Sequence, residues 1–137
     1  MLLEPLTVPG NLESLKAIAL FVFKAAELAG FDRKTTYRLR LAVDEIATNI
    51  IQHGYPKADS EEKITCYAEL NEVYLTIIVE DWGIAYDYRE YIPDSLQKPL
   101  TERNIGGLGI YLAIQSVDDF QYQRLDNCNR HLLSIKR

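Results

Sequence analysis

The stretch LAVDEIATNIIQHGYP, Leu41 to Pro56, is the most informative part of the chain, because its apolar residues repeat at the spacing of a helix. Asp32 is a suitable N-cap for this helix, and Gly54 followed by Pro56 predicts its end. The side chains expected to face a core are Leu39, Val43, Ile46, Ala47 and Ile50. The stretch therefore predicts an amphipathic helix that packs one side against the rest of the domain.

A second side of the same helix carries polar groups. Glu45 and Asn49 stand one turn apart and share a face, and His53 follows one turn later. A carboxylate beside an amide oxygen suits Mg²⁺, which takes few protein ligands and keeps waters or phosphates. The pair is therefore expected to lie off the core and to border a cleft, or else to be a solvated helix edge without a ligand.

The composition is that of a globular protein long enough for one domain: 137 residues, 47% hydrophobic and 26% charged. A net charge of −5 argues against nucleic acid as the main partner. No apolar run approaches the roughly 18 residues that cross a bilayer, and the N-terminus lacks a secretory pattern. Cys66 and Cys128 show no metal-binding or redox spacing. These features indicate a cytoplasmic protein that works without a membrane.

Regular elements are predicted on both sides of the central helix. A first helix should run from a cap at Asn11 to a stop at Gly30. Residues 63–70, KITCYAEL, alternate like a half-buried strand. Residues 73–81, VYLTIIVED, are apolar enough for a central strand, with a turn at Asn71-Glu72 before them.

The rest of the chain is predicted to be a long loop followed by a helix and a hairpin. From Trp82 to Ile105 no period is sustained, and long loops of this kind are usually lids or binding loops. Residues 110–120, IYLAIQSVDDF, predict a short helix. FQYQRL and HLLSIKR predict strands that turn at Asp126-Asn127. This order favours a two-layer α/β sandwich with an antiparallel or mixed sheet.

Two further segments could contact a ligand. Asp81 ends an apolar strand, and Gly83 follows where backbone must turn or approach another group closely; an ordinary Asp-x-Gly turn is the alternative. The second segment is GGLG, Gly106 to Gly109, which is expected to open a helix whose free N–H groups attract phosphate, or to act as a hinge. It matches neither of the two familiar glycine-rich phosphate loops.

In combination and in this order, ExxxN with His53, DxGxxxD from Asp81 to Asp87, and GGLG resemble the Bergerat-fold ATPases shared by gyrase B, Hsp90, histidine kinases and MutL. Within that superfamily, LRLAVDEIATNIIQHGYP and GGLGIYLAIQSVDDF resemble the anti-sigma factor serine/threonine kinases of bacterial partner-switching systems. The resemblance covers nearly the whole chain. It implies one histidine-kinase-like ATPase domain over residues 1–137, with a mixed, mostly antiparallel sheet covered by helices on one face, and an ATP lid over about residues 86–106.

The resemblance assigns a role to each matching residue. Glu45 matches the catalytic glutamate that accepts a proton from the attacking hydroxyl, and Asn49 matches the Mg²⁺ ligand that also holds the phosphates. Asp81 matches the aspartate that binds the adenine amino group, and Gly83 matches the glycine beside the base. Tyr86 stands where the family usually has phenylalanine and is expected to contact the nucleotide.

The resemblance also extends to the end of the lid. Gly107 and Gly109 match the glycines whose backbone follows the phosphates of ATP or ADP, and Gly106 and Leu108 complete this nucleotide-binding stretch. Arg103, just before it, either pairs with a terminal phosphate or stays solvated.

The resemblance leaves the roles of two residues open. The last strand lacks the family's usual glycine-threonine pair, and Ser134 either does or does not replace it. His53 recurs in the family and has either a structural role at the helix end or a direct phosphate contact.

The function implied by resemblance is ATP- and Mg²⁺-dependent phosphorylation of a serine on an anti-anti-sigma partner of the STAS type, together with sequestration of a sigma factor. A homodimer is implied as well. One alternative is a nucleotide-binding partner-switch module without significant kinase activity. Another is the catalytic domain of a two-component histidine kinase, which is disfavoured because His53 lies inside the ATP-binding helix and is a poor phosphate acceptor.

Overall fold

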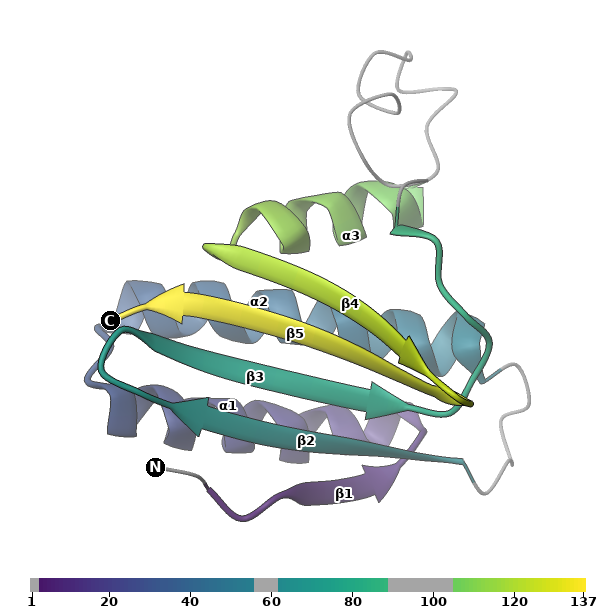
Figure 1. Ribbon diagram of the computed structural model, residues 1–137, viewed down its shortest axis with the longest axis horizontal. Helices are drawn as coiled ribbons and strands as arrows, with labels where there is room; N and C mark the ends of the chain where they lie inside the picture. The colour runs from purple at the N-terminus through teal and green to yellow at the C-terminus, as the bar shows by residue number, and fades with distance from the viewer. Residues whose placement is uncertain (1–2, 56–61, 89–104) are drawn as a thin grey trace.

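Within residues 3–55, 62–88 and 105–137, which the computed structural model describes, a five-stranded sheet forms one layer and helices form the other (Figure 1). All strand pairs are antiparallel, in the order β1-β2-β3-β5-β4. The strands are β1 (Leu6–Pro9), β2 (Lys63–Leu70), β3 (Tyr74–Asp81), β4 (Asp119–Leu125) and β5 (Cys128–Lys136). The predicted two-layer α/β sandwich is therefore confirmed, with the sheet fully antiparallel over this part of the chain.

The first two helices follow the predicted order, with the cap at Asp32 and the stop at Gly30 confirmed, but a 3-10 turn precedes the first helix and a π-turn replaces the predicted end of the second. A 3-10 turn η1 (Leu12–Ser14) leads into α1 (Leu15–Ala29), and α2 (Arg33–Asn49) follows. The side chain of Asn11 accepts from the Ser14 amide at 3.2 Å, and that of Asp32 accepts from the Thr35 amide at 2.8 Å. Gly30 ends α1 with a φ of 79°, in the left-handed region that favours glycine. The third helix is α3 (Ile105–Gln115).

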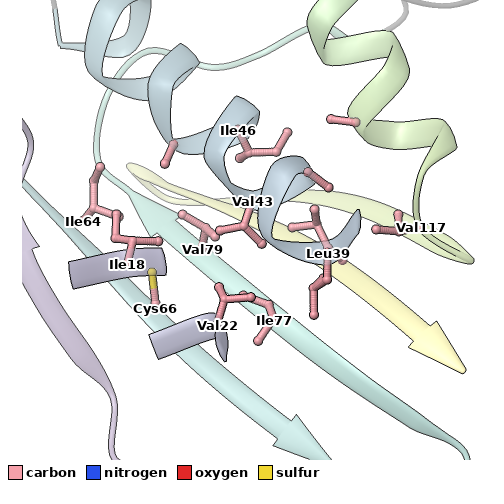
Figure 2. Packing of buried hydrophobic residues seen from close by; sticks show 14 of the residues in the cluster. Ile18, Val22, Leu39, Val43, Ile46, Ile64, Cys66, Ile77, Val79 and Val117 are labelled. Carbon is pink, nitrogen blue, oxygen red and sulfur yellow. The ribbon is translucent and has the colours of Figure 1, made fainter. Parts of the chain in front are cut away.

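The core lies between the sheet and the helices, as Figure 2 shows. The predicted stripe of α2 is completely buried there, where α2 contacts β3 and β5 and α1 contacts β2 and β3. β3 pairs with β2 on one side and with β5 on the other, so it is the central strand that its apolar run predicts. The labelled residues of Figure 2 come from α1, α2 and the sheet: Ile18, Val22, Leu39, Val43, Ile46, Ile64, Cys66, Ile77 and Val79, with Val117 following α3.

Three details differ from the sequence prediction. β1 was not predicted, because four residues that end in Pro9 are too short to show an alternating pattern. α3 begins at Ile105, so the GGLG stretch lies inside the helix rather than before it. This helix ends at Gln115, and Phe120 belongs to β4 instead.

Packing explains the position of α3. Glycine is a poor helix former, so local propensity alone favours a loop at GGLG. Contacts between α3 and α2 override that propensity, because the buried residues Ile110 and Ala113 anchor the helix to the core. Over the described ranges, no helix is both long and apolar enough to cross a membrane.

Candidate functional site

The polar edge of α2 is the first part of the site. Glu45 is exposed, whereas only 8% of Asn49 is exposed, so Asn49 lies deeper than the cleft position predicted for it. Within the described part of the chain, no acceptor lies within hydrogen-bond distance of the buried Asn49 Nδ2. A buried donor without a partner costs about 1–3 kcal/mol, so this amide is suited to a group supplied by a ligand.

Glu45 lies directly against α3. A Cβ added at Gly109 would come within 2.6 Å of the Glu45 Oε2 atom, which is too close for any real side chain. Glycine at this position lets the carboxylate occupy its observed place against α3, and any larger residue would displace it. The structure therefore brings together Glu45 and Gly109, two predicted site residues that lie far apart in the sequence.

The end of α2 meets the turn after β3. α2 continues as a single π-helical turn, η2 (Ile50–Gly54), closed by a hydrogen bond of 2.9 Å from the Tyr55 amide to the Ile50 carbonyl. A Cβ at Gly83 would lie 2.5 Å from the Gly54 carbonyl oxygen, so these two backbones are in tight contact. π-turns of this kind are often found at functional sites. The predicted closeness of Gly83 to another group is thus met by the backbone of η2.

The Tyr55 hydroxyl links the end of η2 to β2 and to the turn after β3. It accepts from the Trp82 amide at 2.7 Å and donates to the Lys63 carbonyl at 2.8 Å. Burial raises the pKa of Tyr55, so the hydroxyl keeps its proton and can serve as donor and acceptor at once. The start of β2, the turn after β3 and the end of η2 are thereby held in one arrangement.

Asp81 sits in a fully buried polar network. Its Oδ1 accepts from the Gly83 amide and from Asn129 Nδ2, both at 2.9 Å. Its Oδ2 lies 2.8 Å from His131 Nε2. The other ring nitrogen of His131, Nδ1, lies 2.6 Å from the Tyr88 hydroxyl. Because Asp81, Asn129 and His131 have no exposed surface, a ligand can reach this carboxylate only if neighbouring residues shift.

Asn129 and His131 were not predicted from the sequence. They face the helices from β5, where Asn129 lies opposite Asp81 and His131 opposite Val79. Ser134, which was considered for the missing hydroxyl, pairs instead with Thr76 at 2.7 Å, so it does not contact Asp81. The turn at Asp126-Asn127 fixes only the register of β5 against β4, so no local signal places these residues opposite β3.

An aromatic cluster lies beside this network. Tyr86 stacks on Tyr88 with ring centroids 5.6 Å apart, and it makes a T-shaped contact with the His131 ring at a centroid distance of 5.1 Å. The Tyr86 amide donates to the Tyr122 hydroxyl at 3.0 Å. Tyr86 therefore occupies the wall next to Asp81, where the sequence placed a nucleotide contact.

Of the remaining predicted residues, some lie within the described structure and others do not. Gly106, Gly107 and Leu108 lie in the first turns of α3, next to Gly109. Arg103 and most of the predicted lid lie outside the described residues. His53 is exposed in the π-turn.

A cavity of about 530 Å³ lies elsewhere, at the junction of η1 and η2. It is poorly suited to a nucleotide, because Glu13 is the charged residue of its lining and would repel phosphates. None of the predicted site residues lines it: its residues are Gly10, Asn11, Leu12, Glu13, Ile51, Gln52 and Tyr55. The chemistry of the donor groups thus favours the edge of α2 over this cavity.

The arrangement along α2 is a continuous row. Glu45 touches α3 at one end, Asn49 offers a free amide in the middle, and Gly54 touches the Asp81 turn at the other end. At 1.5 Å per residue, Glu45 and Asn49 are about 6 Å apart along α2, and the π-turn continues to Gly54. The row joins a carboxylate, a glycine-containing helix start and a buried acidic turn, which are groups able to contact the two ends of an elongated, charged ligand.

Known proteins are similar to this chain in sequence and in fold. Residues 8–135 match the histidine kinase-like ATPase domain family. A serine-protein kinase RsbW of Bacillus cereus is 34% identical in an alignment of 118 residues that covers 83% of this chain and 72% of that protein. One from Bacillus thuringiensis is 33% identical over the same shares.

The fold comparison agrees with the sequence comparison. The crystal structure of the RsbU and RsbW domains of Rv1364c from Mycobacterium tuberculosis superposes with a TM-score of 0.66 at 16% identity. The match covers 98% of this chain and about a third, 33%, of that one. The chain therefore belongs to the histidine kinase-like ATPase family, within the group of the RsbW serine-protein kinases.

Proposed function

We propose that this chain binds ATP along the edge of α2 and transfers its terminal phosphate to a serine of a partner protein. The observation that carries the proposal is the row from Glu45, against Gly109, through the unpaired Asn49 amide to Gly54, against the Asp81 turn. Family membership supports the same reading, because the relatives in Bacillus are named serine-protein kinases.

The phosphate end of the proposed site lies at α3. Gly109 lets the Glu45 carboxylate lie close against α3, and the early N–H groups of α3 have no partner within their own helix. Such groups attract phosphate oxygens. The GGLG stretch, Gly106 to Gly109, is proposed to bind the phosphates, with Arg103 as a further contact.

Asn49 fits the role of a Mg²⁺ ligand that also binds phosphate. Its Oδ1 is the hard oxygen that this ion prefers, while the unpaired Nδ2 can donate to a phosphate oxygen. Within the described ranges, no three His, Cys, Asp or Glu side chains gather to form a cage for a metal. A bound Mg²⁺ would supply charge neutralisation of the phosphates.

Glu45 is proposed as the general base. Its exposed carboxylate at the phosphate end can accept the proton of the incoming serine hydroxyl while the oxygen bonds to the terminal phosphorus. The bond from that phosphorus to its bridging oxygen breaks, and ADP leaves. Positioning of the two reactants supplies most of the rate enhancement in such a transfer.

The base end is proposed to lie at Asp81 and Gly83, with Tyr86 beside them. The carboxylate accepts a hydrogen bond from the adenine amino group once the neighbouring residues have shifted to admit the base. The whole chain is proposed to act as one ATPase domain, with residues 86–106 as a lid of which 89–104 lie outside the described structure.

By likeness to partner-switching regulators, the serine belongs to an anti-anti-sigma protein of the STAS type, and the same kinase sequesters a sigma factor as a cytoplasmic homodimer. When its antagonist is phosphorylated, the sigma factor stays bound and inactive.

Radiolabelled ATP incubated with a candidate partner tests the proposal. We expect label on the partner that survives acid, as phosphoserine does, and none on the chain itself. Acid-labile label on the chain would instead indicate a histidine kinase domain. Nucleotide binding without any transfer would indicate a binding module.

A further inference from the structure

Within the proposed ATP site, on which this inference rests, we infer that His131 and Asn129 are positioning residues that aim the Asp81 carboxylate at the amino group of the base. Both side chains are completely buried, both reach Asp81 within 2.9 Å, and no other role follows from the proposed transfer reaction.

The hydrogen bonds at Asp81 leave one acceptor position free. A carboxylate offers about four lone-pair sites, two on each oxygen. Gly83 and Asn129 fill both sites on Oδ1, and His131 fills one on Oδ2. One N–H donor can therefore still bind, at Oδ2, in a direction that the His131 ring sets.

The ring of His131 is itself held in place. An ionised carboxylate only accepts hydrogen bonds, so the tautomer with hydrogen on Nε2 serves Asp81 and leaves Nδ1 to accept from the Tyr88 hydroxyl. The ring also packs against Tyr86 and Tyr122. These contacts fix the orientation of the N–H that points at Asp81.

Asn129 is held in the same way. Its Oδ1 accepts from the Tyr122 hydroxyl and from Arg124 Nη1, and its Nδ2 also donates to the Ile84 carbonyl at 2.8 Å. It therefore ties Asp81 to the segment that follows β3. Because β5 pairs with β3 along its length, both positioning side chains sit on the same sheet as the carboxylate they orient.

It follows that selectivity for a 6-amino purine depends on Asn129 and His131 of β5. A purine with an amino group at position 6 gains the hydrogen bond to Oδ2, whereas purine riboside triphosphate, which lacks that group, does not. Wild-type protein should bind ATP at least about tenfold more tightly than this analogue.

The test compares the ratio of the two affinities across variants, by fluorescent-nucleotide displacement. His131→Phe keeps an aromatic ring but removes the N–H, and should reduce the ratio to about twofold or less. His131→Gln restores a donor and should recover most of it. Ser134→Ala, on the same strand but away from Asp81, is the control and should leave the ratio unchanged. A merely structural role for His131 would weaken both nucleotides alike and keep the ratio.

A safer variant covers the case in which His131→Phe fails to fold. Tyr88→Phe removes only the hydroxyl that holds His131 Nδ1 and should lower the ratio to a value between those of the wild type and His131→Phe. An unchanged ratio in Tyr88→Phe, or in a folded His131→Phe, would overturn the inference while ATP binding stands. Failure of the wild type to bind ATP would overturn the proposed function itself.

Discussion

Replacing Gly109 by alanine should separate stability from activity. The new Cβ would lie 2.6 Å from Glu45 Oε2, against an ordinary contact of at least 3.4 Å, so the carboxylate must retreat by about 0.8 Å. The atom that gives way is the far end of a flexible, exposed side chain, so the backbone need not move. The cost of the substitution therefore falls on the position of Glu45 rather than on the fold.

Two effects of the substitution on the free energy of unfolding oppose each other. Alanine is better than glycine within a helix by about 0.8–1.0 kcal/mol. Moving an exposed side chain changes the free energy of unfolding by about 0.5 kcal/mol at most. The net effect expected is a stabilisation of roughly 0.5 kcal/mol. A catalytic group displaced by about 1 Å can cost about a hundredfold in rate, so phosphate transfer should fall by that order.

Urea unfolding and transfer of radiolabelled phosphate to the partner measure the two effects. Leu112→Ala, on the exposed side of α3, is the control and should change neither by much. In a Glu45→Gln background, Gly109→Ala should have no further effect on transfer, because both changes act on the same group. A further loss in that background, or unchanged transfer in the single variant, would refute the role given to this contact.

Three more predictions follow from other contacts. Gly83→Ala should lower the free energy of unfolding by about 1–3 kcal/mol, because its Cβ would meet the backbone oxygen of Gly54 at 2.5 Å, and urea unfolding with no loss would contradict that packing. Asn49→Ala should abolish the strengthening of ATP binding by Mg²⁺, and calorimetry that still shows the full metal effect would exclude Asn49 as the ligand. Hydrogen bonds from Thr35 lower the pKa of Asp32 in the folded state, so the stabilisation by this cap is present above the unfolded pKa and is lost as pH falls through the folded one. The difference in Tm between wild type and Asp32→Ala should therefore be larger at pH 7 than at about pH 2, and a difference independent of pH would argue against the charged cap.

Local signals were sufficient for the elements that carry a cap or a clear period. Asp32 caps α2 and Gly30 ends α1 as predicted, whereas Asn11 caps the 3-10 turn η1 that leads into α1. The continuous apolar run of β3 predicted a central strand, and β3 indeed lies between β2 and β5 in the sheet.

The parts that sequence reasoning missed depend on contacts between distant segments. Asn129 and His131 reach Asp81 across 48 and 50 residues, and neither belongs to a motif. β1 is a four-residue edge strand that gains its order from pairing with β2. Likewise, packing on α2 draws Gly109 into a helix that its own propensity disfavours.

The central claim is that a single nucleotide site runs along α2 from Glu45 to Gly54. Titration of Mg-ATP into isotopically labelled protein, followed by amide resonances, tests it most directly. We expect the largest changes at Asn49, Gly83 and Gly109. Changes centred instead on Gly10 and Glu13, in the cavity beside η1, would contradict the claim.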